Sequence, residues 1–533
     1  MSPVRPGSTA RRQAGRCCLV DFDGPSPPSA LERRIADAHV AGVVLFRKNV
    51  QSAAQVAALV MDLQALARAA GAPPLLVAID HEGGAVTRFA PHPAAGPTMT
   101  PLPSAMALGA AGDPALARAA GAVAGAELRA LGIHLNFAPV LDVNTTPANP
   151  VIGARAFGET AAVVTALGVA YLEGLQAAGV GATAKHFPGH GDTTVDSHLG
   201  LPRVDRTAAR LEAVELAPFA AAVRAGVAAV MTAHVVYPAL DPSGMPATMS
   251  APILTGLLRG RWGYGGLVVS DALGMRAIVD HVGAGDAAVA AVAAGCDLLL
   301  ALGPAALQDE VLERLALAIE RGVLGAERVA AAHARVAQAL ARWGAGAAAT
   351  GPSAIPRRPP DLAAHVGTPA HLDVARRIAD AAVTLVRDPA GRLPLRGRVA
   401  VVALGAHAGA GPPEDLRPDV AVALRRAGAD AVARPHDADD LPAFDRVVAV
   451  TWGRGTPDAR TAEVFRALHR RAGDRLVVVA AGDPYELAAA PGDAACVATY
   501  GPDPFSVDAA AQVLLGRRPA RGRLPVTLPA GAP

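Results

Sequence analysis

Short apolar runs recur through the first 300 residues, each bounded by glycine, proline or polar residues and followed by an alanine-rich stretch. Apolar runs of this length are typical of buried strands, and the alanine-rich stretches between them favour helices. We therefore predict strands at residues 18–22, 42–46, 74–80, 134–142, 181–187, 228–234, 266–271 and 296–302.

This alternation gives eight β/α repeats, which require a parallel sheet with right-handed crossovers. Eight such units in about 300 residues are the size of a closed (β/α)₈ barrel of the TIM type. The pattern alone leaves an open, doubly wound sheet as the alternative.

Residues 344–371 are rich in glycine, alanine and proline and have no periodicity, so we interpret them as a linker. Beyond them, apolar runs at 383–388, 398–405, 430–435, 446–452, 475–482 and 495–501 predict a C-terminal α/β sandwich domain. The predicted organisation is a disordered N-terminus at 1–15, a barrel at 16–343, the linker, and the second domain at 372–533. The glycines that follow RVAVVALG do not match G-x-G-x-x-G, so no dinucleotide site is predicted.

Polar side chains stand at the carboxyl ends of several predicted barrel strands, namely Asp80, Asp142, Lys185, His186, His234 and Asp271. Barrel enzymes gather their catalytic groups at this end, so these residues should meet at one mouth. A single Asp near a strand is often only the N-cap of the next helix, and this explanation fits Asp142 and Asp297 equally well.

The most polar segment of the chain is KHFPGHGDTTVDSHLGLP, from Lys185 to Pro202. Its Pro and Gly residues exclude a helix, so its titratable groups should lie on a loop at a strand end. In the Asp-x-His pair, the Asp196 carboxylate can orient the His198 imidazole for general acid/base chemistry. The same histidines and aspartates could instead ligate zinc or manganese, but neither an H-E-x-x-H helix nor a cysteine pair accompanies them, and we predict no metal.

Composition adds little to this picture. The 533 residues carry 49 Lys and Arg against 47 Asp and Glu, a formal charge of +2 that gives no reason to expect a nucleic acid or a membrane surface as partner. The four cysteines have no metal spacing and fit a reducing compartment, and the N-terminus has no apolar core of a secretory signal. We therefore expect a cytoplasmic protein.

Several motifs resemble those of glycoside hydrolase family 3, and within it the two-domain β-N-acetylglucosaminidases of cell-wall recycling. They include AIDHEGGAVTRF (78–89), NFAPVLDVN (136–144), IGARAFG (152–158), KHFPGHGDTTVDSHLGLP (185–202), MTAH (231–234) and VVSDALGM (268–275) in the barrel, and GDPYEL (482–487) in the second domain. The Asp-Ser-His signature is the most specific, because glucosidase members of the family lack it and draw their acid from the second domain.

The resemblance implies a role for each matching position. Asp271 would be the nucleophile, His198 the acid/base and Asp196 its partner. The residues expected to contact the sugar are Asp80, Arg88, Arg155, Lys185, His186, Met231 and His234. For Arg88 and Arg155 an ion pair that braces the barrel is the alternative, and His81 departs from the family, which usually has Gln at this position.

The implied activity is a retaining exo-β-N-acetylglucosaminidase that removes terminal β-linked GlcNAc from muropeptide or chitin-derived fragments through a glycosyl-Asp intermediate. It would need no cofactor and no partner beyond the carbohydrate, and would be a monomer or weak homo-oligomer. Phosphorolysis, which would release GlcNAc 1-phosphate, remains an alternative. β-Glucosidase activity and an inactive sugar-binding scaffold fit less well.

Overall fold

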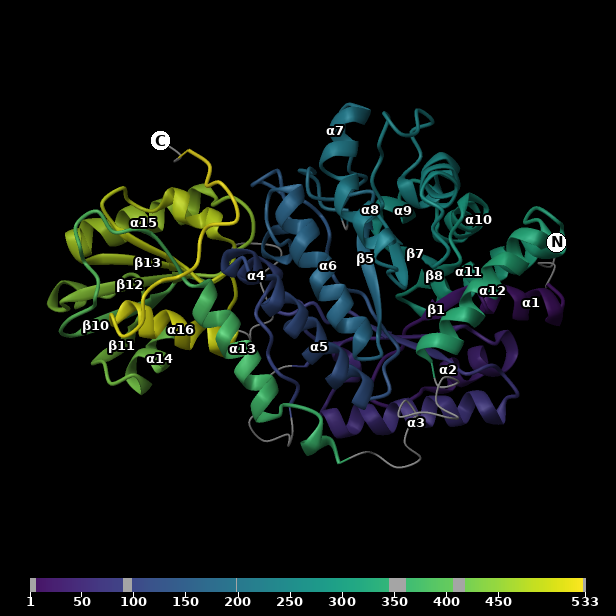
Figure 1. The fold of residues 1–533 in the computed structure, drawn as a ribbon, viewed down its shortest axis with the longest axis horizontal. Coiled ribbons are helices and arrows are strands. Elements are labelled where there is room, and N and C mark those ends of the chain that lie inside the picture. Colours follow the sequence, from purple (N-terminus) through teal and green to yellow (C-terminus); the bar gives the residue numbers. More distant parts are fainter. Residues whose placement is uncertain (1–5, 90–97, 198, 345–360, 406–417, 531–533) are drawn as a thin grey trace.

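The computed structural model describes residues 6–89, 98–197, 199–344, 361–405 and 418–530. Within these ranges the chain forms two α/β domains that lie side by side, with the N-terminus at the far end of the first and the C-terminus on the second (Figure 1). The sequence predicted a linker at 344–371 and an acid/base role for His198, but residues 345–360 and His198 itself lie outside the described residues.

In the first domain eight parallel strands close into a barrel in the order β1 to β8. The strands are β1 Cys18–Val20, β2 Gly42–Leu45, β3 Leu76–Ile79, β4 Leu135–Asn136, β5 Gly181–Phe187, β6 Ala229–Thr232, β7 Leu267–Ala272 and β8 Leu298–Ala301. Each predicted run overlaps one of these strands, β7 extending one residue beyond its run, and closure excludes the doubly wound alternative. Strand β4 is much shorter than its predicted run because the chain turns away at Pro139, which has no N–H to donate to a ladder.

Helices surround the barrel because its strands are apolar on both faces and must be covered on the outside. Sequence signals mark where they begin: the Ser52 hydroxyl accepts from the N–H of Gln55, and Asp113 caps a helix that starts with Pro114. The helices are α1 Ser8–Gly15, α2 Ser29–Arg33, α3 Ala53–Ala69, α4 Ala105–Ala111, α5 Pro114–Ala130, α6 Ala161–Ala177, α7 Ala208–Ala213, α8 Leu216–Arg224, α9 Arg276–Val279, α10 Ala284–Ala294, α11 Ala305–Glu320 and α12 Ala326–Trp343, together with a π-helix at Pro252–Arg261.

The prediction of disorder at residues 1–15 is wrong for residues 8–15. These residues form α1, whose Ala10 and Ala14 are buried in the barrel's outer apolar layer. The alanines pay little entropy on ordering, so even a short helix with two buried positions is held in place by packing.

The second domain is a six-stranded sheet in the order β11-β10-β12-β13-β14-β9, parallel except for β9. Its strands are β9 Thr384–Arg387, β10 Val399–Ala403, β11 Ala431–Arg434, β12 Arg446–Thr451, β13 Leu476–Ala480 and β14 Ala495–Ala498. Helices α13 Pro369–Ala382, α14 Val420–Arg426, α15 Ala459–Ala472 and α16 Pro504–Leu514 cover its faces. All six predicted strands are present.

The two domains share an apolar cluster and several hydrogen bonds. Met106 and Ala107 of α4 are buried with residues of the second sheet, and the Ser104 hydroxyl donates to the carbonyl of Tyr500 at 2.7 Å. The Asn144 amide also donates to the Tyr485 hydroxyl at 2.6 Å. The second domain is therefore fixed against the barrel loops that follow β3 and β4.

Candidate active site

The carboxyl ends of the barrel strands carry a connected network of acids and cations. Asp80 follows β3 and accepts from Lys185 Nζ of β5 at 2.8 Å and from Arg88 Nη2 at 3.0 Å. Burial opposes ionisation of this carboxyl, yet the two cations hold its pKa below the ordinary value. Three predicted sugar contacts, Asp80, Arg88 and Lys185, are thus brought together.

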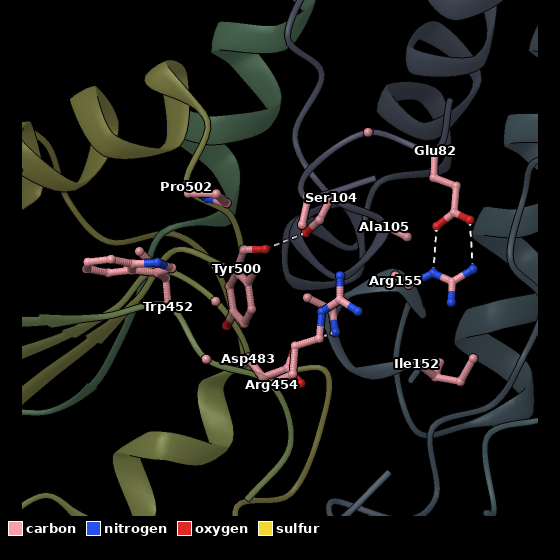
Figure 2. A pocket seen from close by; sticks show the side chains of 16 residues that line it. Glu82, Ser104, Ala105, Ile152, Arg155, Trp452, Arg454, Asp483, Tyr500 and Pro502 are labelled. Atoms are coloured by element: carbon pink, nitrogen blue, oxygen red, sulfur yellow. Dashed lines mark hydrogen bonds and ion pairs between the residues drawn. The ribbon is translucent and has the colours of Figure 1, made fainter. Parts of the chain in front are cut away.

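Glu82 extends the network and was not predicted as a site residue. Its carboxylate receives Arg155 bidentately, through Nε at 2.9 Å and Nη2 at 2.8 Å (Figure 2), and lies 2.6 Å from Lys185 Nζ. Despite burial, Arg155 and Lys185 keep the pKa of Glu82 far below its usual range. The only sequence signal for Glu82 was its position two residues after Asp80, which places it in the same loop.

All three nitrogens of the Arg155 guanidinium are engaged. Besides the two that bind Glu82, Nη1 donates to the carbonyl of Val151 at 3.2 Å, and Nη2 lies 3.5 Å from Nε2 of His186. This is the bracing ion pair that was the alternative for Arg155. Arg88 is likewise paired, with Asp80, and stacks its guanidinium over the Phe46 ring at 5.2 Å.

The sequence left open that Asp142 caps the helix that follows it. The structure excludes this, because the next long helix, α6, is capped by Thr160. The fully buried carboxylate of Asp142 accepts from the backbone N–H groups of His186 and His190 through Oδ1, at 3.1 and 2.6 Å, and contacts His186 Nδ1 through Oδ2 at 2.7 Å. Asp142 therefore orients the His186 ring and the turn that follows it.

Asp297 is also no helix cap. It precedes β8 at the opposite end of the barrel from the site, where its carboxylate pairs with Arg259, Arg328 and Arg335 and accepts the N–H of Val268. Its role is to close the bottom of the barrel, far from the chemistry at the carboxyl ends.

Asp271 is half-buried at the end of β7, and its Oδ1 accepts the N–H of Ala272 at 2.7 Å. Burial would raise the pKa of Asp271, but the fields of His234 and His186, the Ala272 hydrogen bond and Lys185 together lower it. His234 is buried and lies 3.0 Å from the Ala272 carbonyl through Nε2. The mouth therefore holds an ionised carboxylate near Lys185 and two histidines.

The loop after β5 is held by its polar residues. His190 contacts the Thr193 hydroxyl through Nδ1 at 2.8 Å and the Ser197 hydroxyl through Nε2 at 3.1 Å. The Ser197 carbonyl accepts the N–H of Ala277 at 3.2 Å, which ties the loop to the segment after Asp271. Asp196, next to Ser197, is partly exposed.

Met231 and His81 are both buried in the barrel domain. Met231 on β6 is 2% exposed and packs in the apolar cluster inside the barrel, so its sugar contact stays a prediction. His81 is buried, contacts the Thr87 hydroxyl through Nδ1 at 3.2 Å, and has its pKa lowered to about 4 by burial and by Arg88. It is neutral at pH 7 and so replaces the family's Gln without adding charge.

Among the described residues, no group of three or more His, Cys, Asp or Glu side chains is arranged to hold a metal ion. In that same part of the chain, no helix is both long and apolar enough to cross a membrane.

These features define the class of protein, a barrel enzyme whose mouth presents fixed donors and acceptors to a hydroxyl-rich ligand. The model of the glycosyl hydrolase family 3 N-terminal domain matches residues 16–339. The chain belongs to glycoside hydrolase family 3, which confirms the family resemblance predicted from its motifs.

Individual proteins named as hexosaminidases or glucosaminidases are also similar to this chain. The beta-hexosaminidase A of Pseudoalteromonas piscicida is 38% identical over 71% of this chain, a match that spans 64% of that protein's length. The beta-hexosaminidase of Chromobacterium violaceum is 42% identical over 56% of this chain and 82% of its own. A solved family 3 beta-N-acetylglucosaminidase from Paenibacillus sp. str. FPU-7 superimposes with a TM-score of 0.88 at 36% identity, over 98% of this chain and 99% of that one.

Proposed function

We propose that the protein is a retaining exo-β-N-acetylglucosaminidase that hydrolyses terminal β-linked GlcNAc from muropeptide or chitin-derived fragments. The observation that supports this most directly is Asp271, an ionised carboxylate at the carboxyl end of β7 among His234, His186 and Lys185. A carboxylate held in this state can attack an anomeric carbon. Relatives named beta-hexosaminidase and beta-N-acetylglucosaminidase support the choice of sugar.

In the proposed mechanism Asp271 displaces the departing sugar and forms a glycosyl-enzyme, and water then releases GlcNAc with net retention. His198, oriented by Asp196, gives a proton to the departing oxygen in the first step and takes one from water in the second. Their loop follows β5 and is tied through Ser197 to the segment after β7, which supports a dyad that faces Asp271.

Sugar recognition is proposed for the network around Asp80. Its carboxylate accepts from ring hydroxyls, Arg88 and Lys185 donate to hydroxyls and the N-acetyl carbonyl, and His186 contacts a hydroxyl through Nε2. Because Lys185 and Arg88 already hold Asp80, the acceptor is fixed before substrate arrives, which reduces the entropy cost of orienting the ring.

The test compares an aryl β-GlcNAc with the matching aryl β-glucoside, using wild type and Asp271→Asn. We expect a preference for the GlcNAc substrate and a loss in the variant of roughly a thousandfold or more in kcat. The first-formed anomer, observed by NMR, should be β, and product analysis in phosphate buffer should give GlcNAc rather than GlcNAc 1-phosphate. Preference for the glucoside, or undiminished turnover by Asp271→Asn, would refute the assignment.

A further inference from the structure

A small cavity lies between the barrel mouth and the second domain, next to the Glu82–Arg155 pair (Figure 2). The second domain contributes the segment after β12, including Trp452 and Arg454, and the segment after β13, including Asp483. The cavity holds about 30 Å³, which is enough for one or two waters or a carboxylate-sized group but not for a sugar ring.

Arg454 reaches from the second domain toward Arg155. The backbone on both sides of it is fixed: the Gly453 N–H donates to Glu486 at 3.0 Å, and the Gly455 N–H donates to Asp483 at 2.7 Å. The guanidinium is thus presented to the barrel by a rigid turn, as a binding group needs to be.

Within the described part of the chain, no hydrogen bond or ion pair holds the Arg454 side chain. Arg155, its neighbour, is committed to Glu82. Asp483, the acid closest to it in the same domain, has both oxygens occupied by the N–H groups of Ala154 and Gly455, at 2.6 and 2.7 Å.

The surroundings of Arg454 leave its charge poorly compensated. Burial and the like charge of Arg155 lower the pKa of Arg454, and the opposing effects of Asp483, Glu82 and Asp196 do not restore it. A partly desolvated guanidinium without a close partner costs free energy, and proteins retain such costs mainly at functional sites.

The cavity also indicates where this cation lies relative to the chemistry. Arg454 enters it from the second domain, with the Glu82–Arg155 pair on the barrel side (Figure 2). Arg454 is therefore on the second-domain side of the mouth, whereas Lys185 and Arg88 hold Asp80 within the barrel.

We propose that Arg454 forms an anion site that binds a carboxylate or phosphate group on the second-domain side of the active site. This inference rests on the proposed function. The anion comes either from the departing sugar, as the lactyl carboxylate of an N-acetylmuramic acid unit, or from inorganic phosphate, and in both cases it would accept charge-assisted hydrogen bonds from the guanidinium.

The test uses the full-length protein with Arg454→Gln and Arg454→Lys, and Arg460→Gln as the control. Arg460 is exposed at the start of α15 and does not line the cavity, so its loss removes the same charge without touching the site. The substrates are GlcNAc β-linked to N-acetylmuramic acid, neutral chitobiose, and an aryl β-GlcNAc.

We expect Arg454→Gln to lower kcat/KM for the anionic disaccharide roughly 10-fold to 100-fold relative to chitobiose, with Arg454→Lys in between and the control unchanged. If phosphate is the ligand, the variant instead abolishes the effect of phosphate on chitobiose turnover. Equal effects on all substrates, or no effect on any, would overturn the proposal.

A wild type that cleaves none of the three substrates would refute the proposed function, not the anion site. Calorimetric binding of N-acetylmuramic acid and of inorganic phosphate, each compared with GlcNAc, tests the site without turnover. Weaker binding of either anion by Arg454→Gln alone supports it, and identical binding by wild type and variant overturns it.

Discussion

Replacing Asp142 with Asn tests whether the proposed sugar-binding histidine is oriented by its buried carboxylate. Both backbone bonds of Asp142 end on Oδ1, while Oδ2 alone contacts Nδ1 of His186 at 2.7 Å. An Asn with its oxygen at the Oδ1 position keeps both backbone bonds. It changes one contact, because an amide N–H now faces Nδ1.

The consequence is a change of tautomer. With Asp142 the ring proton lies on Nδ1, whereas an amide donor at that point moves the proton to Nε2. That nitrogen lies 3.5 Å from Nη2 of Arg155, so two donors would face each other. The lost hydrogen bond to a charged group is worth about 1.5–3 kcal/mol, which corresponds to roughly 10-fold to 150-fold.

We therefore expect Asp142→Asn to lower kcat/KM on an aryl β-GlcNAc by roughly 10-fold to 100-fold. The loss should appear largely in KM, since a His186 ring with the wrong nitrogen protonated weakens binding of the sugar in both ground and transition states. Steady-state kinetics and a thermal unfolding curve measure the two effects separately.

Asp192→Asn is the matched control. Asp192 is also buried and lies in the same region, but it pairs with Arg206 and accepts from the Thr146 hydroxyl, neither of which belongs to the proposed sugar site. It should lose stability with little change in KM. If Asp142→Asn retains wild-type kinetics while destabilised like the control, then Asp142 only anchors the backbone and the orientation argument is wrong.

Three further changes test the charge balance and packing around the site. Glu82→Gln leaves two buried cations without their shared carboxylate and should cost about 3–5 kcal/mol in denaturant unfolding. Burial raises the pKa of Asp483 to about 6 from an ordinary 3.8. Between these two pH values the Asp483 carboxyl is protonated in the folded protein but ionised in the unfolded chain. Its contribution to the free energy of unfolding therefore falls as pH rises from about 4 to about 6. In Asp483→Asn, unfolding free energy relative to wild type should rise over that interval, by at most about 3 kcal/mol. Gly191→Ala should unfold or fail to fold, because its Cβ would lie 1.9 Å from the Val143 carbonyl oxygen.

Each of these has its own contrary result. Glu82→Gln with wild-type stability would mean that the cations find other partners. A stability difference between Asp483→Asn and wild type that does not change with pH would mean that Asp483 is ionised in the folded state as it is when unfolded. Gly200→Ala in the same loop meets nothing closer than 3.6 Å and should be tolerated, so equal effects at Gly191 and Gly200 would contradict the packing argument.

Most strands were predictable because they are buried on both faces, and a short run of Val, Leu and Ala such as RLVVVAAG admits few other interpretations. Convergence at the mouth followed from topology alone, since closing a parallel barrel brings every strand's carboxyl end to one rim. Asp80, Lys185, His186 and Asp271 were found in this way.

The interaction partners of these polar residues were harder to predict than their positions next to strands. Asp142 and Asp297 both stand next to strands, yet one orients His186 and the other closes the opposite end of the barrel, and the difference depends on which end of its strand each occupies. The hydrophobic pattern fixes the bounds of a strand only to within one or two residues. An error of that size decides whether an Asp is placed before or after its strand, and so which of the two roles it is given.

The second domain's contribution had no sequence signal at all. Arg454 lies about 370 residues after Glu82 and about 300 after Arg155, in a turn whose composition resembles any other βα connection. Only docking, through contacts such as Ser104 with Tyr500, brings it to the mouth. In a structure, a residue that one domain contributes to a site on the other is recognised by a side-chain charge that its own domain does not neutralise.

The charges of the mouth divide into two regions with different chemistry. Around Asp80 each acid is matched by cations within hydrogen-bond distance, so that region is close to neutral and suits an uncharged sugar ring. On the side of the second domain, Arg454 adds a positive charge, and among the described residues no acid pairs with it at hydrogen-bond distance. A ligand that spans both regions gains most when it is neutral at one end and anionic at the other, since each end then meets the field that complements it. Selectivity for the leaving group would thus be set by the second domain, while recognition of GlcNAc stays with the barrel.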